Sequence, residues 1–360
     1  MIPQANSMST ATPRPPFFLG VDLGGTNIKA GVVDDNGRPL SWAAPDGRTQ
    51  SCVEIATEAE KGPEHGIQRI CQAAREAVAN VGLTLNDIQA VGVGSPGPMD
   101  LEAQIIINPY NLPGWLNLPL AKRVGESLGL RSVLQNDANA AAFGEFWAGV
   151  GRGRRSLVQF TLGTGIGCGI VVDGKLLEGR HSHGAECGHI RIDVRPDARL
   201  NNTGLRGSLE AYASATGVTA RAREALQKSD EPSALRDVEG GGGKLTSKTI
   251  FNAAKEGDAL ATRIVDETAF YLAVGAVNLM HTIDPDVVVF SGGMINAGDF
   301  LLEKIRKYVV ENALPVPGEK TLVAFAQLGT DAGFIGAAGC ARSSFATSAS
   351  SPTSTTARAP

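Results

Sequence analysis

The stretch VDLGGTNIKAGVVDD, residues 21–35, decides the fold. An apolar run from Phe17 to Leu23 is broken by Gly24-Gly25-Thr26-Asn27 and resumes from Ile28 to Val33, which is the pattern of a β-hairpin. Residues 160–174, FTLGTGIGCGIVVDG, repeat this order, with a glycine turn at 163–167. Such an internal duplication predicts two similar α/β lobes, with a ligand bound in the cleft between them.

The segments around the two hairpins alternate between strand and helix patterns, as an α/β fold requires. Helices are predicted at 64–82, 118–128, 137–147, 260–283 and 332–341, and strands at 88–94, 132–135, 156–162, 168–172 and 287–290. In the last helix Gly333, Gly336 and Gly339 fall on nearly one face. We therefore expect this helix to pack very closely on a neighbour.

The chain is expected to divide into a small lobe at 17–134, joined by a C-terminal helix at 331–343, and a large lobe at 135–330. Two segments fall outside these lobes, a leader at 1–16 rich in Pro, Ser and Thr and a low-complexity tail at 344–360, and four glycines at 240–243 interrupt the large lobe between helical segments. We predict that the leader is flexible, that the glycines form a loose loop and that the tail is disordered.

Composition excludes several classes of protein. The 360 residues carry a net charge of −4, and the basic run Arg152–Arg155 is too short to indicate nucleic-acid binding. No run of about 18 apolar residues predicts a membrane span, and the N-terminus lacks the pattern of a signal peptide. The five cysteines form no CxxC pair, so reduced thiols in a cytoplasmic protein are expected.

The two glycine turns are candidate phosphate-binding sites, because such turns expose backbone N–H groups without side chains in the way. Thr26 and Thr164 add hydroxyl donors. Either turn alone is more often structural, but a pair related by duplication favours phosphate binding. No GxxxxGK[ST] motif is present, and the second turn leads into a strand rather than a helix, which argues against a dinucleotide fold.

Two carboxylates follow predicted strands. Asp22 lies between apolar Val21 and Leu23, where a carboxylate needs a partner. Mg²⁺ is one candidate and capping of the turn is the other. Asp137 follows Asn136 where a strand enters a helix, a position that suits either a helix N-cap or the base of a phosphoryl transfer.

Asn136 and Asn139 lie beside Asp137 and have the chemistry to orient a polyol. Glu186 and His189 are three residues apart in a polar, glycine-rich segment, so they are expected to converge on one ligand. A metal site is the rival interpretation, although His181 and His183 supply too few further ligands.

Taken together, these residues resemble the ROK family of sugar kinases, which have the two-lobed, ribonuclease H-like fold of the actin-like ATPase superfamily. The resemblance covers about residues 17–343. Besides the two glycine turns it rests on SPGP at 95–98, NLPGW at 111–115, NDANAAAFGE at 136–145, GAECGHI at 184–190, GSLEAYAS at 207–214 and SGGM at 291–294. Each motif is modest alone, but their joint order is specific.

The resemblance implies a role for each matching residue. Asp137 would be the general base on the 6-hydroxyl of a hexose, and Asp22 would help to hold Mg²⁺. The sugar would contact Gly97, Asn111, Asn136, Glu186, His189 and Glu210, and ATP would contact Gly24, Gly25, Thr26, Asn27, Lys29, Thr164, Gly165, Gly292 and Gly293. A homodimer is also implied.

One segment departs from the family pattern. Many members carry a structural zinc site in a CxCGxxGC run, but residues 201–208 read NNTGLRGS. Asn201, Thr203 and Ser208 stand where thiolates would be, and His189 alone does not hold zinc. Zinc is therefore not expected, and hydrogen bonds are expected to hold this loop in place.

These observations predict an ATP-dependent hexokinase with glucose as the first candidate. N-acetylmannosamine, N-acetylglucosamine, mannose and fructose stay open as acceptors, and polyphosphate stays open as a donor. A non-catalytic sugar-sensing or assembly protein is the alternative from another class. The family's transcriptional regulators carry a helix-turn-helix domain before the kinase-like part, whereas about sixteen residues precede the first strand here.

Overall fold

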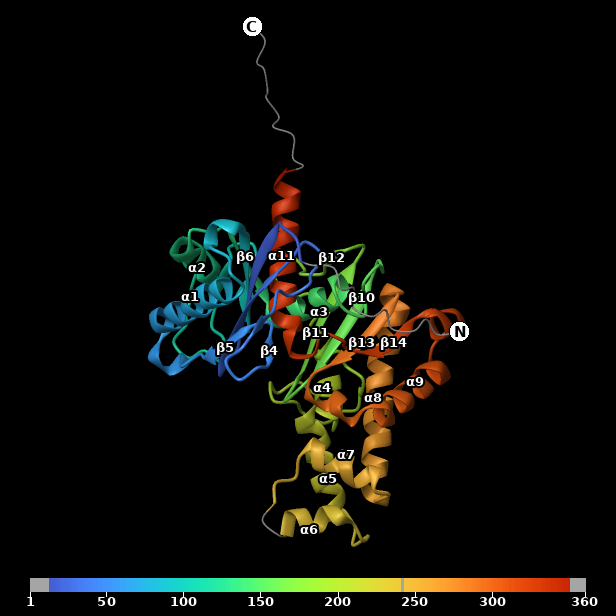
Figure 1. Cartoon of the computed structure of the whole chain (residues 1–360). Helices are drawn as coiled ribbons and strands as arrows, with labels where there is room; N and C mark the ends of the chain where they lie inside the picture. Colours follow the sequence, from blue (N-terminus) through green and yellow to red (C-terminus); the bar gives the residue numbers. More distant parts are fainter. Residues whose placement is uncertain (1–12, 241–242, 350–360) are drawn as a thin grey trace. The chain divides into compact units, whose positions relative to one another are not determined.

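The computed structural model describes residues 13–240 and 243–349 and divides into two compact units (Figure 1). The first unit comprises the chain up to Ala140 together with the chain from Gly333 onward, and the second comprises Ala141–Ala332. The change of unit therefore falls inside helix α3 (Asp137–Trp147), whereas the sequence places it at 134–135.

The first unit is built on a mixed sheet with the strand order β5-β2-β1-β6-β9. The central strand β1 pairs antiparallel with β2 and parallel with β6, and β6 pairs parallel with β9. The bounds are β1 Phe17–Leu23, β2 Asn27–Val33, β5 Val53–Ala56, β6 Ile88–Ser95 and β9 Ser132–Asn136. The predicted hairpin thus forms one half of this sheet.

The second unit repeats the pattern with the order β12-β11-β10-β13-β14. Here β10 pairs antiparallel with β11 and parallel with β13, and β13 pairs parallel with β14. The bounds are β10 Leu157–Leu162, β11 Ile166–Val172, β12 Lys175–Leu176, β13 Val287–Ser291 and β14 Leu322–Phe325. The two sheets share order and strand directions, which confirms the duplication. The second turn is shorter than predicted, because Ile166 and Gly167 already pair with β10.

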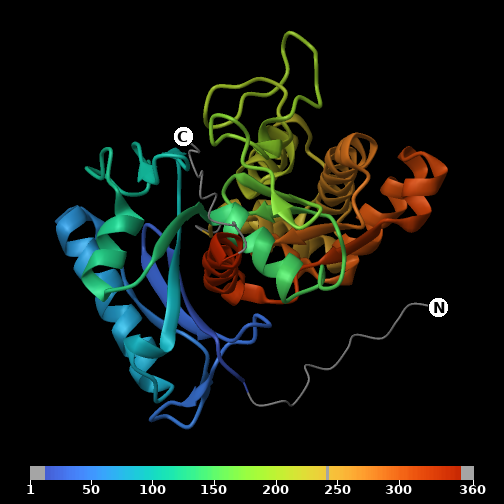
Figure 2. The same ribbon diagram turned by 90° about the horizontal axis from the view of Figure 1, so that it is seen from above.

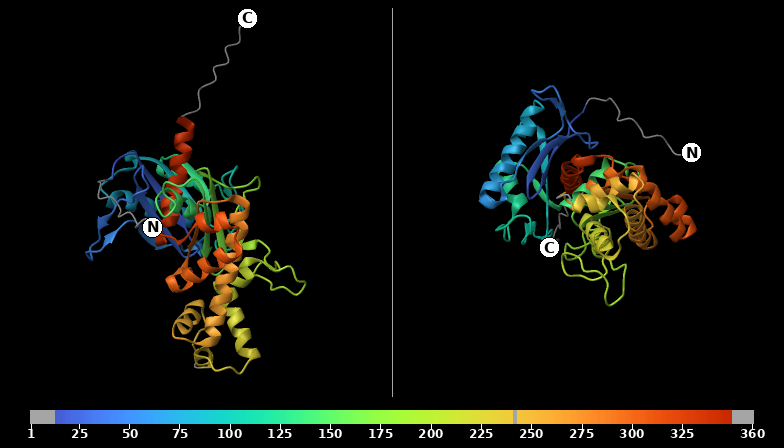
Figure 3. Two further views of the ribbon diagram at one scale, coloured as in Figure 1. Left: turned by 90° about the vertical axis from the view of Figure 1, so that its right-hand side faces the viewer. Right: turned by 90° about the horizontal axis from the view of Figure 1, so that it is seen from below.

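Helices complete each unit. The first unit contains α1 (Pro63–Asn80), α2 (Leu120–Leu128) and α11 (Ala332–Ala349). The second contains α4 (Leu209–Ala213), α5 (Ala215–Lys228), α6 (Ala234–Gly240), α7 (Ser247–Lys255), α8 (Ala259–Ile283), α9 (Asp299–Asn312) and α10 (Pro315–Lys320). Helices α5, α6 and α7 gather at the N-terminal half of α8, away from the sheet (Figure 3). No helix in the described ranges is long and apolar enough to cross a membrane.

Two sequence predictions about irregular segments need comment. The helix predicted to end near 341 continues to Ala349, so residues 344–349 are helical and the prediction of a disordered tail is wrong for them. Gly240 ends α6 instead of opening a loop. The remaining parts of these predictions, at 1–12, 241–242 and 350–360, lie outside the described residues.

Helix α11 packs on the sheet of the first unit with almost no space between the two backbones; Figure 2 shows the helix, in red, nearly end-on beside the blue strands. A Cβ atom added to Gly20 of β1 would lie 1.8 Å from the carbonyl oxygen of Phe334. One added to Gly92 of β6 would lie 1.8 Å from the carbonyl oxygen of Ala337. The predicted close packing is confirmed, and glycines on the strands permit it.

Gly92→Ala tests this contact. The added methyl group would collide with backbone that has no freedom to move aside, so we expect the first unit to lose about 2 kcal/mol or more of stability. Gly94→Ala on the same strand is the matched control, because its Cβ would lie 3.4 Å from the Cβ of Ala140, an ordinary contact. Denaturant unfolding of both variants measures the difference, and equal midpoints would contradict the close approach.

Candidate active site

The first glycine turn joins β1 to β2 and is held from outside by Thr57. The N–H of Gly24 donates to the carbonyl of Asn27 at 2.9 Å, which closes the turn. The hydroxyl of Thr57 donates to the carbonyl of Gly24 and its N–H donates to that of Thr26, each at 2.7 Å. Thr57 is fully buried. Sequence reasoning missed Thr57, because a single threonine after a short strand carries no signal.

Asn111 lies directly against this turn. A Cβ atom added to Gly25 would lie 2.8 Å from the carbonyl oxygen of Asn111. The structure therefore brings together a residue predicted to contact phosphate and one predicted to contact sugar. Only a glycine at position 25 permits the contact.

Asn27 and Lys29, both predicted to contact ATP, are directed at Glu54 on the neighbouring strand β5. The Nδ2 of Asn27 donates to Oε1 of Glu54 at 2.8 Å, and the Nζ of Lys29 lies 3.7 Å from Oε2. The register of the hairpin also places Lys29 opposite Asp22. The lysine thus lies between two carboxylates of the sheet.

Asp22 occupies the carboxyl end of β1, against the first turn of α11. A Cβ atom added to Gly333 would lie 2.3 Å from Oδ2 of Asp22. Burial raises the pKa of Asp22, and the charge of Lys29 acts in the opposite direction. Within the described chain no N–H of the glycine turn donates to this carboxylate, which argues against the capping alternative. A buried, hard oxygen donor beside a glycine turn has the chemistry to hold Mg²⁺.

The strands β1, β6 and β9 run parallel, so their carboxyl ends share one edge of the sheet. Gly97 follows β6 and Asn136 ends β9 at this edge. A Cβ atom added to Gly97 would lie 3.8 Å from Nδ2 of Asn136. The backbone of Gly97 and the amide of Asn136 are therefore neighbours, as their shared role predicts.

Asn136 is the cap of α3, which bears on the helix-capping interpretation of Asp137. The Oδ1 of Asn136 accepts hydrogen bonds from the N–H groups of Ala138 at 3.0 Å and Asn139 at 3.1 Å. Asp137 is the first residue of the helix, half-buried, and its Oδ1 accepts from Ala138 at 2.8 Å. Since Asn136 already caps the helix, the carboxylate of Asp137 is not required for that purpose.

Asn139, which the sequence places beside Asp137 to orient a polyol, is buried. Its side chain is 5% exposed and its Nδ2 donates to Oε1 of Gln135 at 3.3 Å. It faces the interior because it lies one helical turn beyond the strand end, on the face of α3 that packs inward.

The second glycine turn, in the other unit, is held by the N-terminus of α5. The N–H of Gly163 donates to the carbonyl of Gly165 at 3.0 Å. The N–H of Ala215 donates to the carbonyl of Gly163 at 3.0 Å, and the hydroxyl of Thr216 donates to that of Thr164 at 2.8 Å. The positive end of the helix dipole therefore lies beside the turn and favours an anion there.

Glu210 on α4 is joined to the same turn. Its Oε2 accepts the N–H of Ile166 at 3.0 Å, and a Cβ atom added to Gly165 would lie 2.3 Å from that oxygen. Glu210 is 8% exposed. The structure thus places a residue predicted to bind sugar in direct contact with a residue predicted to bind phosphate.

Gly292 and Gly293 follow β13, whose parallel partner β10 leads into the second turn. Gly292 has a φ of 88°, and its Cβ would lie 2.5 Å from the carbonyl oxygen of Leu162. Gly293 has no atom within 4 Å of an added Cβ and presents open backbone. The predicted adenosine and phosphate segments therefore share the carboxyl edge of this sheet.

Glu186 and His189 converge, as their spacing predicts. Glu186 precedes the single turn Cys187–His189 and His189 ends it; a Cβ atom added to Gly188 of this turn would lie 2.0 Å from the carbonyl oxygen of Ile166. The Nε2 of His189 lies 4.0 Å from Oε2 of Glu186. Across the described ranges, no cluster of three or more His, Cys, Asp or Glu side chains is arranged to hold a metal ion.

The loop that lacks thiolates is held by hydrogen bonds, as predicted. It belongs to the long yellow-green segment between β12 and α4 in Figure 2. The Nδ2 of Asn201 lies 3.1 Å from Nδ1 of His189, and the hydroxyl of Ser208 caps α4 by accepting the N–H of Ala211. Asn201, Glu210 and Thr216 line one small cavity of about 150 Å³.

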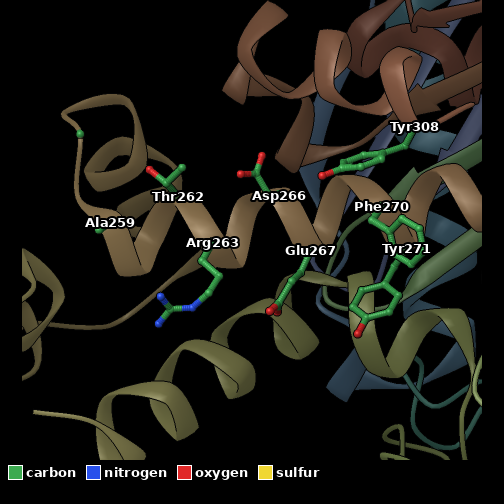
Figure 4. A pocket seen from close by; sticks show the side chains of 9 residues that line it. Ala259, Thr262, Arg263, Asp266, Glu267, Phe270, Tyr271 and Tyr308 are labelled. Atoms are coloured by element: carbon green, nitrogen blue, oxygen red, sulfur yellow. The ribbon is translucent and has the colours of Figure 1, made fainter. Parts of the chain in front are cut away.

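A larger hollow of about 640 Å³ lies on α8 and α9 and is unrelated to these residues. Thr262, Asp266 and Phe270 follow one side of α8, and Arg263, Glu267 and Tyr271 follow another (Figure 4). No predicted site residue lines this hollow. The carboxyl edge of the sheet in each unit is therefore taken as a candidate site.

Comparisons with known proteins identify the family of this chain. The ROK family profile matches residues 18–344. The glucokinase of Thermotoga maritima is 37% identical over 89% of this chain and 96% of that protein. A ROK hexokinase from Thermus thermophilus is 32% identical with a TM-score of 0.74, covering 92% of this chain and 99% of that one. A ROK glucokinase from Streptomyces griseus, solved with glucose and AMPPNP, is 34% identical with a TM-score of 0.69 over 91% and 99%.

The predicted actin-like ATPase fold is thus confirmed by structures that match nearly the whole chain. The duplicated sheets, the two glycine turns and the family profile all point to the same conclusion: this protein is a member of the ROK family.

Proposed function

We propose that this chain is an ATP-dependent glucokinase that transfers the γ-phosphoryl group of ATP to the 6-hydroxyl of glucose. Its family and its glucokinase relatives, at 34–37% identity, make it a sugar kinase. The observation that carries the proposal is the shared edge of β1, β6 and β9. The first glycine turn, the pair Gly97 and Asn136, and Asp137 all lie at that edge.

Phosphate binding is assigned to the two glycine turns. Gly24, Gly25 and Thr26 in the first unit, with Thr164 and Gly165 in the second, offer backbone N–H and hydroxyl donors. The N-terminus of α5 adds positive potential at the second turn. Gly292 and Gly293 are assigned to the adenosine, and the open backbone at Gly293 supports this assignment.

Asp137 is assigned as the general base, which accepts the proton of the sugar hydroxyl as that oxygen attacks phosphorus. Its position at the start of α3 is rigid because Asn136 caps the helix. The Nδ2 of Asn136, beside the backbone of Gly97, is left to hydrogen-bond a neighbouring hydroxyl. Asn111, Glu186, His189 and Glu210 are assigned to the remaining sugar hydroxyls.

Asp22 is assigned to Mg²⁺, directly or through water. Its burial and raised pKa are the properties of a carboxylate that gains from a nearby cation. Mg²⁺ bound with ATP would neutralise charge on the phosphate oxygens. Lys29, opposite Asp22, is assigned to the same region.

The direct test is ADP release with Mg²⁺ and ATP across a panel of sugars. We expect glucose to give the highest kcat/KM. N-acetylmannosamine belongs in the panel because N-acetylmannosamine kinases are also relatives, at 31–32% identity. Mannose, fructose and N-acetylglucosamine complete it, and polyphosphate replaces ATP in a parallel series. A higher kcat/KM for another sugar would assign the protein to that substrate, and no turnover with any would contradict the proposal.

Asp137→Asn should remove the general base and leave the fold intact, since Asn136 retains the cap. We expect kcat for glucose to fall by about a hundred-fold to ten-thousand-fold. Circular dichroism and thermal unfolding check the fold. A folded variant that retains activity would exclude Asp137 from the mechanism.

Asp22→Asn should weaken the response of the activity to Mg²⁺ without lowering the stability of the fold. We expect the Mg²⁺ concentration for half-maximal activity to rise by about ten-fold or more. Burial raises the pKa of Asp22 in the folded state. The folded state is therefore favoured at low pH, where the carboxyl is neutral, and this contribution to stability is lost as the pH rises through the pKa of the folded state. The unfolding midpoint of the variant at pH 7 should therefore equal or exceed that of the parent chain.

Asp46→Asn is the control for this comparison, because Asp46 is an exposed carboxylate paired with Arg48. It should leave the Mg²⁺ dependence unchanged. A Mg²⁺ response of Asp22→Asn equal to that of the control would contradict the assignment.

A homodimer, expected from the family resemblance, is part of the proposal as well. Sedimentation equilibrium of the full chain, at concentrations used in the kinetic assay, distinguishes a dimer from a monomer.

A further inference from the structure

The side chain of Asn201 makes hydrogen bonds at both ends of its amide. Its Oδ1 accepts the N–H of Thr203 at 3.0 Å and the N–H of Leu205 at 2.9 Å, and it bonds the Thr203 hydroxyl at 2.9 Å. Its other end, Nδ2, lies 3.1 Å from Nδ1 of His189. These contacts determine which terminal atom of the Asn201 amide is the oxygen and which is the nitrogen.

A backbone N–H group only donates, so the atom that meets two of them must be an acceptor. The oxygen of Asn201 therefore faces Thr203 and Leu205. The reversed amide would place an NH₂ group against two N–H donors, which is unfavourable. Nδ2 is thus the atom that faces His189, and it is a donor.

The protonation of the imidazole follows from this contact. Nδ1 of His189 accepts the hydrogen bond from Asn201, so it carries no proton. In a neutral ring the proton then lies on the other nitrogen, Nε2. That nitrogen lies 4.0 Å from Oε2 of Glu186, which is too long for a direct hydrogen bond.

We infer that Asn201 is a positioning residue, which holds His189 as the tautomer with its proton on Nε2. Nε2–H of His189 and the carboxylate of Glu186 then form a donor and an acceptor side by side. Both side chains are partly exposed, at 30% and 53%. The ligand of this pair is a hydroxyl group; that it belongs to the hexose rests on the proposed function.

A hydroxyl group matches this pair because it donates one hydrogen bond and also accepts. It donates to Glu186 and accepts from His189. With the opposite tautomer both protein atoms would be acceptors, and one O–H hydrogen cannot satisfy two of them. The contact with Asn201 therefore converts two competing acceptors into a complementary pair.

The loop holds Asn201 in register with His189. The N–H of Asn201 donates to the carbonyl of Leu205 at 2.9 Å, which closes a tight turn. At the far end of the loop, the N–H of Leu209 donates to the carbonyl of Ile190 at 2.9 Å. The loop is thus bonded to itself and to the residue that follows His189, so the amide needs no other support.

Nitrogen NMR of the full chain with ¹⁵N-labelled histidine tests the inference. The chemical shift of a ring nitrogen shows whether it carries the proton, and His189→Gln identifies the signals of His189 among the five histidines. At about pH 8.5, roughly two units above the ordinary pKa of histidine, we expect the proton of His189 on Nε2. A proton on Nδ1 would overturn the inference.

Asn201→Asp supplies the second measurement. Aspartate keeps an oxygen acceptor for Thr203 and Leu205 but replaces the donor with an acceptor, so the proton of His189 should move to Nδ1. We expect KM for glucose to rise about ten-fold, the loss of one hydrogen bond, while KM for ATP stays unchanged. Asn202→Asp, an exposed neighbour with the same change of charge, is the matched control.

The outcomes are separable from those of the proposed function. If Asn201→Asp leaves the tautomer and the sugar KM equal to those of the control, the positioning role is wrong. If the tautomer is as inferred in the parent chain and moves in the variant, the role stands even if no sugar is phosphorylated. If the tautomer changes as expected but no sugar is phosphorylated, the assignment of the hexose is wrong and the positioning role of Asn201 is not.

Discussion

Parallel pairing of strands is the constraint on which the rest of this structure depends. Because β1, β6 and β9 run in one direction, the chain leaves each strand at the same edge. Asp22, Gly97 and Asn136 come from distant parts of the sequence and meet there for that reason alone. The second unit repeats the arrangement with β10 and β13, so the second turn and Gly292 also share an edge. The residues assigned to the site gather at these edges because the strand interiors are occupied by core side chains.

Close approach of backbone to backbone is the second recurring feature, and glycine makes it possible. Because Gly20 and Gly92 have no side chains, helix α11 packs directly on the strands, and its first turn covers the carboxylate of Asp22. The same absence of a side chain at Gly25 and Gly165 admits Asn111 and Glu210. The glycines of the turns therefore do more than leave room for a phosphate. They also bring residues assigned to the sugar into contact with residues assigned to the nucleotide.

Polar groups of the candidate site are held in place by hydrogen bonds from neighbouring residues. Thr57 holds the first turn and the start of α5 holds the second. Asn136 caps α3, so the carboxylate of Asp137 is not needed as the cap. In the loop at 201–208, Asn201 orients an imidazole by a single hydrogen bond. The bonds of Thr57, Asn136 and Asn201 lie in partly buried environments, where a missing partner is costly and the geometry is therefore well defined.

The sequence by itself determined the class of fold, the duplication, the two glycine turns and most of the residues assigned to the site. These features are local, since apolar periodicity and glycine turns depend on neighbours along the chain. Only the tertiary structure decided that Asn136 rather than Asp137 caps α3, that Asn139 faces inward, and that Thr57 supports the first turn. It also decided which nitrogen of His189 accepts a hydrogen bond. These facts depend on groups that are distant in sequence, or on the direction in which a side chain points, and a linear pattern contains neither.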